Sequence, residues 1–120
     1  MHDRVQFITH QKKRILFIDL RGCTAEEIQA MLPEIQGAIT AEPRGSVLSL
    51  SDWTDAQISR GLADEIKRTM VFDRPHVKRT AFVGIEKIPK VFLDAFKTFA
   101  RRDFTTFSTL EEAKDWLVQD

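Results

Sequence analysis

The chain has 120 residues, of which 42% are hydrophobic and 30% are charged, a composition typical of one folded domain and not of a disordered segment. Lys plus Arg and Asp plus Glu both number 18, and this zero net charge argues against a dedicated nucleic-acid-binding protein. No apolar stretch approaches the roughly 20 residues that cross a bilayer, so we expect a cytoplasmic protein without stable membrane insertion. The single cysteine, Cys23, cannot form an internal disulfide and fits a reducing compartment.

Strand patterns recur five times along the sequence. Some alternate in polarity, as half-exposed strands do, and others are continuous apolar runs, as in strands buried on both faces. The polar turn at 10–13 joins the first two strands closely enough for a hairpin. The predicted strands cover residues 5–9, 14–20, 46–50, 76–84 and 104–107.

Helical patterns separate the later strands. Thr24 and Glu27 form a capping box that begins the first helix, and we expect Pro33 to kink or split this helix. Pro89 fits the first turn of the third helix, and a capping box within 108–112 begins the fourth. The apolar faces expected to point inward are Ile28, Met31, Leu32, Ile35 and Ile39 in the first helix, Ile58, Leu62, Ile66 and Met70 in the second, Phe92, Ala95, Phe96 and Phe99 in the third, and Ala113, Trp116 and Leu117 in the fourth.

The element order ββαβαβαβα predicts the fold class. Strands that alternate with helices imply right-handed crossovers and parallel neighbours, whereas the initial hairpin makes the first strand antiparallel to the second. We therefore expect one α/β domain over residues 1–120, with a five-stranded, mixed but mostly parallel sheet flanked by helices.

The strongest site signal lies in the loop that joins the strand at 46–50 to the second helix. In open α/β sheets, ligands and partners bind at the carboxyl ends of strands. Free amides at the helix start could bind an anion, but Asp52, Thr54 and Asp55 are also good N-cap residues that would use those amides themselves. The candidate partner-binding residues are Ser51, Asp52, Trp53, Thr54, Asp55, Ser59 and Arg60.

Three other features allow two interpretations each. Trp53 can anchor a protein interface or fold back as a lid over the core, and the sequence does not choose between them. Cys23 precedes a helix start, which can activate a thiol, but we favour an ordinary, partly buried cysteine. The phenylalanine stripe of the third helix could shape a lipid pocket, but we favour a role in the core because a chain of this size needs these residues there.

The sequence predicts no cofactor, no metal site and no enzymatic activity. The histidines lack metal-ligand spacing, no Cys-x-x-Cys occurs, and the glycines are too isolated to form a phosphate-binding loop. We expect His76, next to a proline at a strand start, to be structural or solvent-facing. A Ser-His-Asp arrangement cannot be placed in the predicted fold.

Three passages of the chain are informative beyond their secondary structure: Lys13–Leu20, Val47–Thr54, and Pro75–Gly84 together with Phe107–Leu117. With the element order, they resemble the STAS fold of the sporulation anti-anti-sigma factor, and most closely the SpoIIAA-like group of small bacterial proteins. In that factor a partner kinase phosphorylates a serine at the start of the second helix, within an Asp-Ser-Ser-Gly-Leu-like motif. The resemblance places this acceptor at Ser59, although Ile58 stands where the motif has Asp and Arg60 where it has the second Ser.

The resemblance implies a function of the regulatory class. We expect a non-enzymatic, protein-interaction module with an unidentified protein partner, no nucleic acid and no bound cofactor; a homodimer is left open. The alternative is a carrier of a small apolar ligand or lipid, because lipid-transfer proteins are grouped with this family. An enzyme of unknown type is the third and least favoured hypothesis.

Overall fold

The computed structural model describes residues 3–119, and the predicted element order is confirmed. The strands are β1 (Val5–His10), β2 (Lys13–Asp19), β3 (Val47–Asp52), β4 (Val77–Val83) and β5 (Asp103–Phe107). They form one five-stranded sheet in the order β1-β2-β3-β4-β5. β1 is antiparallel to β2 and every other neighbouring pair is parallel, so the mixed, mostly parallel sheet is confirmed as well.

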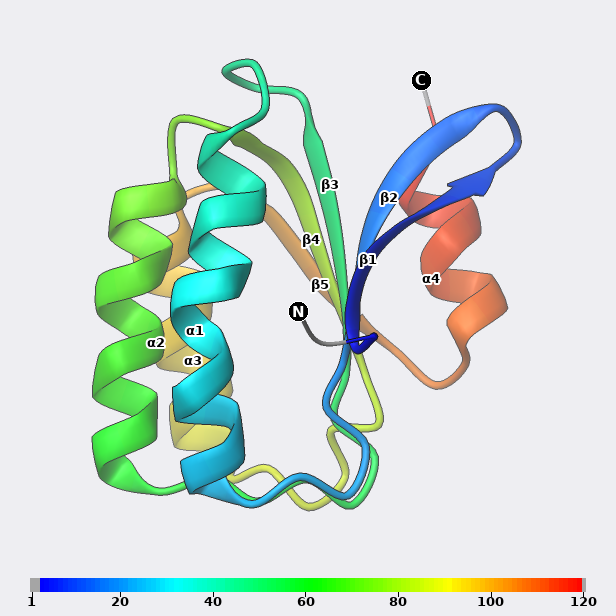
Figure 1. Cartoon of the computed structure of the whole chain (residues 1–120). Coiled ribbons are helices and arrows are strands. Elements are labelled where there is room, and N and C mark those ends of the chain that lie inside the picture. The colour runs from blue at the N-terminus through cyan, green and yellow to red at the C-terminus, as the bar shows by residue number, and fades with distance from the viewer. Residues whose placement is uncertain (1–2, 120) are drawn as a thin grey trace.

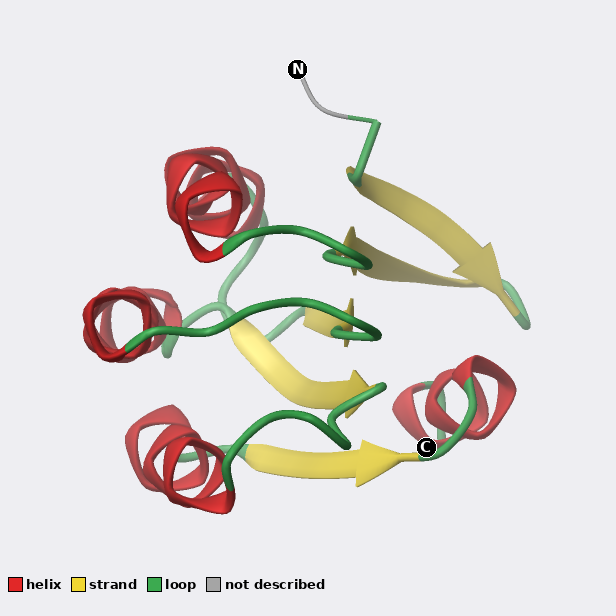
Figure 2. Ribbon diagram, turned by 90° about the horizontal axis from the view of Figure 1, so that it is seen from below, coloured by secondary structure: helices red, strands yellow, loops and turns green. Residues whose placement is uncertain are grey.

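Helices cover both faces of the sheet. α1 (Ala25–Thr40), α2 (Arg60–Asp73) and α3 (Lys90–Ala100) lie side by side on one face, and α4 (Leu110–Leu117) lies on the other (Figures 1 and 2). The larger core lies beneath the three helices. A smaller core lies beneath α4 and consists of Ile15, Leu48, Leu50, Ala81, Val83, Ala113, Leu117 and Val118. The central strands β3 and β4 are therefore covered on both faces. In β3, Leu48 and Leu50 face α4, whereas Ser49 and Ser51 face the three helices on the other side.

α1 begins as predicted but is not divided by its proline. Thr24 and Glu27 form the reciprocal capping box, and the helix then runs without a break through Pro33 to Thr40. Pro33 lies on the exposed side of the helix, where the carbonyl that loses its partner can bond to water instead. Burial of Ile28, Met31, Ile35 and Ile39 against the sheet holds the helix together across that missing hydrogen bond.

The starts of α2 and α3 differ from the predictions by a few residues. Ile58 precedes α2 and does not belong to it, while Pro89 occupies the N-cap position of α3 rather than its first turn. The buried face of α3 consists of Leu93, Phe96 and Ala100. Of the predicted inward stripe, only Phe96 is fully buried, and Phe99 is 39% exposed.

Candidate functional site

The β3–α2 loop begins with a tight, buried turn at the carboxyl edge of the sheet. Asp52 accepts hydrogen bonds at Oδ1 from the backbone N–H of Thr54 (3.1 Å) and from its hydroxyl (2.7 Å). The backbone N–H of Trp53 donates to the carbonyl of Val83 (2.8 Å), which ties the loop to the end of β4. Ser51 and Asp52 are buried, so these two predicted partner-binding residues do not lie on the exposed surface.

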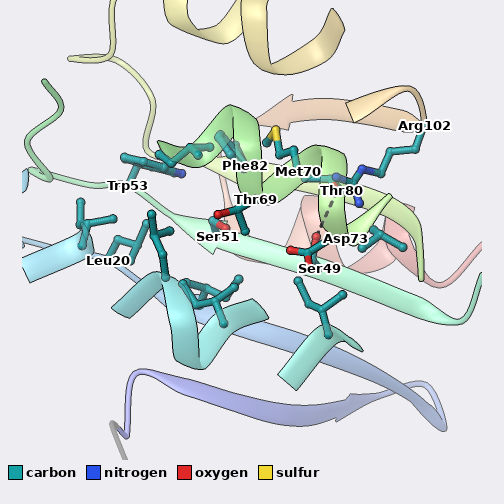
Figure 3. Close-up of a pocket in the computed structure, with 17 residues that line it drawn as sticks. Leu20, Ser49, Ser51, Trp53, Thr69, Met70, Asp73, Thr80, Phe82 and Arg102 are labelled. Atoms are coloured by element: carbon teal, nitrogen blue, oxygen red, sulfur yellow. Dashed lines mark hydrogen bonds between the residues drawn. The ribbon is translucent and has the colours of Figure 1, made fainter. Parts of the chain in front are cut away.

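Trp53 is also buried, with 3% of its surface exposed. Its ring packs against Phe82 with 5.5 Å between centroids. Of the two interpretations that the sequence left open, folding back over the core is therefore confirmed. A solvent-facing interface anchor is wrong for this conformation, because the ring points into the space between the sheet and the helices (Figure 3).

The exposed part of the loop carries the remaining predicted residues. Thr54, Asp55, Ser59 and Arg60 are all exposed. Ser59 is the N-cap of α2, and its hydroxyl accepts a hydrogen bond from the N–H of Leu62 (3.1 Å). Asp52, Thr54 and Asp55 do not cap α2 as the sequence allowed, because the loop adds several residues before the helix starts; Asp55 instead pairs with Lys87 (2.8 Å). A partner-binding role for these four residues stays a prediction.

A cavity of about 70 Å³ lies between the sheet and helices α1 and α2 (Figure 3). Apolar side chains form most of its wall, but hydroxyls line the floor that β3 and β4 provide, where Ser49 and Thr80 are hydrogen-bonded to each other at 3.1 Å. The lining residues are Ile18, Leu20, Ile28, Leu32, Ile35, Ile39, Ser49, Ser51, Trp53, Ile66, Thr69, Met70, Asp73, Val77, Thr80, Phe82 and Arg102.

Three polar atoms of the lining residues are buried without a hydrogen-bond partner: Trp53 Nε1, Asp73 Oδ1 and Arg102 Nε. An unsatisfied buried polar group typically costs about 1–3 kcal/mol, so their clustering around one cavity calls for a physical explanation. Burial raises the pKa of Asp73 to about 7, although the positive charges of Arg102 and His76 oppose this shift. Burial also lowers the pKa of Arg102 to about 10, against the attraction of Asp73.

A model of the SpoIIAA-like family matches residues 15–118. The chain belongs to the SpoIIAA-like family. A solved structure with this fold, an uncharacterized DUF3478-family protein from Shewanella loihica PV-4, is 20% identical with a TM-score of 0.70. The alignment covers 94% of this chain and 91% of that one. None of the curated proteins compared with the chain matches it.

The resemblance to the SpoIIAA-like family stated from the sequence is thus confirmed at the level of family and fold. In this SpoIIAA-like domain, each helix within residues 3–119 is too short or too polar to span a bilayer. Ser59, to which the resemblance assigned a phospho-acceptor role, is the N-cap of α2; its phosphorylation stays a prediction.

Sequence reasoning missed the two charged residues of the cavity. Neither Asp73 nor Arg102 is among the site residues that the sequence predicts. One signal was present: Asp73 follows Ile66 and Met70 at the spacing of the buried face of α2, so a carboxylate occupies a position in an apolar stripe. Arg102 gives no such signal, because only the packing of the α3–β5 connection brings it to the cavity.

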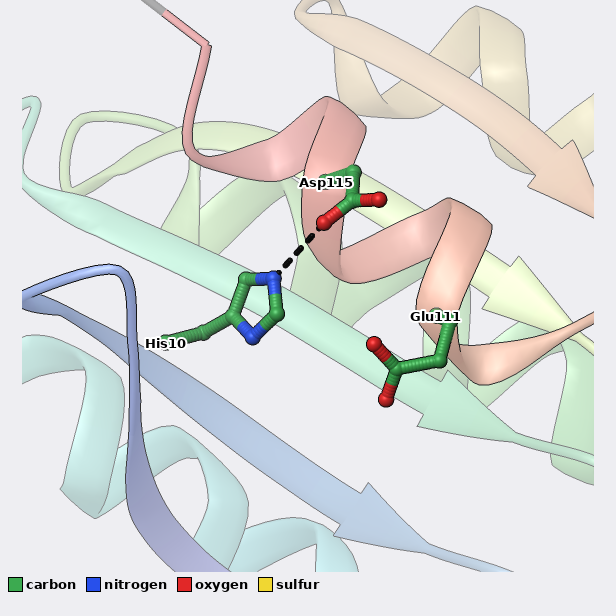
Figure 4. Close-up of side chains that lie close together, drawn as sticks. All are labelled: His10, Glu111 and Asp115. Atoms are coloured by element: carbon green, nitrogen blue, oxygen red, sulfur yellow. Dashed lines mark hydrogen bonds and ion pairs between the residues drawn. The ribbon is translucent and has the colours of Figure 1, made fainter.

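A second cluster lies on the opposite face of the sheet, where the hairpin meets α4 (Figure 4). His10 Nε2 lies 2.8 Å from Asp115 Oδ1, and Gln11 donates to the same oxygen. His10, Glu111 and Asp115 each offer one potential metal-ligand atom, and these three atoms lie within 4.8 Å of one another. All three residue types bind divalent cations. The bonds that the structure shows fasten the β1–β2 hairpin to α4.

Cys23 and His76 occupy structural positions. Cys23 is buried, and this burial raises the pKa of its thiol, so the favoured interpretation of an ordinary cysteine agrees with the structure. His76 Nδ1 is hydrogen-bonded to the carbonyl of Glu42 at 2.8 Å. This bond joins the start of β4 to the end of α1, in agreement with the structural role expected for His76.

Proposed function

We propose that this protein is a non-enzymatic binding module that holds a small molecule between its sheet and helices α1 and α2. The observation that carries the proposal is the cavity itself. Trp53 Nε1, Asp73 Oδ1 and Arg102 Nε are buried, belong to residues that line the same cavity, and have no hydrogen-bond partner in the protein. A ligand inside would offer those atoms hydrogen bonds and would fill apolar volume at the same time.

The volume limits what the cavity holds in this conformation. A cavity of 150 Å³ accommodates a benzene ring of six atoms, and this one has about 70 Å³. A compact molecule fits, whereas a lipid acyl chain would require α1 and α2 to separate. Of the two carriers that the sequence suggested, the structure therefore favours a small-ligand carrier over a lipid carrier.

The test is to recover the molecule. Protein purified under non-denaturing conditions from its native host would be unfolded, and the released small molecules would be identified by mass spectrometry. The control variant is Thr69→Leu, because Thr69 lines the cavity from α2 and a leucine there occupies part of its volume. We expect a compound that is released in stoichiometric amount by the natural protein and not by the variant. Equal release from both, or none from either, would overturn the proposal.

The exposed loop supports a second candidate function, a protein-docking surface. Thr54, Asp55, Ser59 and Arg60 are exposed on one loop at the carboxyl edge of the sheet, where partners of α/β domains commonly bind. Trp53 lies in the same loop and lines the cavity, so docking outside and binding inside would share one structural element.

This second function predicts a loss of partner binding for Arg60→Glu in affinity capture from the native host. Arg68→Glu is the matched control, because Arg68 is an exposed arginine on α2 outside the loop. Phosphosite mapping of the captured protein tests Ser59 directly. A partner that binds both variants equally does not use this loop.

A further inference from the structure

The unpartnered polar atoms lie toward two ends of the cavity. Asp73 and Arg102 approach it from the end of α2 and from the α3–β5 connection, and Trp53 lies at the other end of the lining residues (Figure 3). Asp73 and Trp53 are each 3% exposed. Polar side chains that are buried this completely and directed into a shared space distinguish a binding site from an empty packing defect.

The end of the cavity formed by Asp73 and Arg102 restricts the chemical class of the ligand. Arg102 Nε–H can only donate, so it needs an acceptor. Above about pH 7 the Asp73 carboxylate is ionised and can only accept, so it needs a donor. An anion would accept from Arg102 but would be repelled by Asp73, and a cation would have the reverse problem. In a site of low dielectric each repulsion is strong. A neutral group that both accepts and donates satisfies the two atoms together.

We propose that the cavity binds a compact, uncharged molecule whose primary amide or hydroxyl group lies between Asp73 and Arg102, with its apolar part against α1 and Met70. This inference rests on the proposed function and names the class of ligand. From the ratio of the cavity volumes given above, a volume of 70 Å³ corresponds to about three non-hydrogen atoms. Ordered water could satisfy the same polar atoms, and the experiment must separate water from a ligand.

The experiment uses three probes with the same number of non-hydrogen atoms. Acetamide, the smallest primary amide with an apolar part, both donates and accepts; acetone only accepts, and acetate is charged. The readout is NMR of the protein with ¹³C-labelled methionine methyl groups. Met70 lines the cavity and should shift on binding, whereas Met31 is buried in the same core but does not line the cavity, so it is the internal control.

At about pH 8, where Asp73 is mostly ionised, we expect acetamide to shift Met70 with a Kd about ten-fold lower than those of acetone and acetate, the discrimination typical of one buried unpaired group. In Asp73→Asn the negative charge is absent and Arg102 remains, so acetate should bind nearly as well as acetamide. Because asparagine has nearly the same shape as aspartate, this reversal would arise from charge and not from a change in packing.

A xenon experiment distinguishes a failure of this inference from a failure of the proposed function. Xenon binds apolar cavities without hydrogen bonds, so a xenon-induced shift of Met70 that is lost in Thr69→Leu shows that the cavity admits a guest. If xenon shifts Met70 but the three probes bind equally or not at all, water satisfies the polar pair, and this inference fails while the proposed function stands. If xenon also leaves Met70 unchanged, the cavity is closed and both fail.

Discussion

Gly84 lies against the backbone of Thr54, so that a Cβ built on Gly84 would be 2.9 Å from the Thr54 Cα. Gly84 also has a φ of +70°, a left-handed conformation that favours glycine. This close approach brings the end of β4 against the β3–α2 loop, where Trp53 donates its backbone hydrogen bond to Val83. The position of the Trp53 ring in the cavity therefore depends on the absence of a side chain at residue 84.

Gly84→Ala should lower the free energy of unfolding by about 2–4 kcal/mol, because backbone strain and overlap with Thr54 add to each other. Urea denaturation followed by circular dichroism measures this change. The control is Gly37→Ala in α1, where a Cβ would meet nothing within 4 Å and where alanine should stabilise the helix by about 0.5–1 kcal/mol. A neutral Gly84→Ala would mean that the two loops are not held this closely.

Trp53→Ala should lower the free energy of unfolding by about 3–5 kcal/mol, as expected for truncation of a buried aromatic residue. This outcome reverses the expectation for an interface anchor, whose removal leaves folding intact. Phe72→Ala is the comparison: Phe72 is 65% exposed and its truncation should change stability by no more than about 0.5 kcal/mol. Similar stabilities of the two variants would place the Trp53 ring outside the core.

Asp73 should make stability depend on pH. Its folded-state pKa, about 7, is raised above the ordinary value of 3.8, so the folded protein binds the proton more tightly than the unfolded chain does. The resulting stabilisation is fully present below the ordinary pKa and is lost as pH rises through about 7. Arg102 and His76 are the charged groups that act on Asp73, and Arg102 keeps its charge throughout this range.

The corresponding measurement is urea denaturation from about pH 5 to about pH 8. The natural protein should lose ~1–3 kcal/mol of stability over this range through Asp73, and Asp73→Asn should lack this contribution. The difference between the two proteins, and not the slope of either alone, isolates Asp73 from the histidines. Parallel curves for the two proteins would show that Asp73 stays ionised throughout.

Ser59→Ala should lower the free energy of unfolding by about 1 kcal/mol, because the N–H of Leu62 loses its capping hydroxyl. Ser59→Asp should retain the stability of the natural protein, since a carboxylate both caps the helix and interacts favourably with its dipole. Thermal denaturation of the three proteins provides the comparison. If Ser59→Asp is as unstable as Ser59→Ala, the cap geometry at this residue is wrong.

Local patterns in the sequence were sufficient for the secondary structure and for the mixed, mostly parallel character of the sheet. The capping box at Thr24 and Glu27, the continuous apolar runs and the polar turns each depend on residues a few positions apart, and the helices between the later strands then imply parallel pairing. The order of the strands in the sheet is known only from the structure. The boundaries were less certain: α2 starts after Ile58 rather than at it, because the cap is Ser59 and not one of the earlier carboxylates.

The candidate site depended on contacts that no local pattern encodes. The sequence placed a site at the loop after β3, but only the packed layers show that Trp53 points inward and that Ser51 and Asp52 are buried. Asp73 and Arg102 meet at one cavity although a whole helix and strand separate them in the chain. Periodicity reports which face of an element is buried, whereas a cavity and its unpaired charges arise from how three elements fit together.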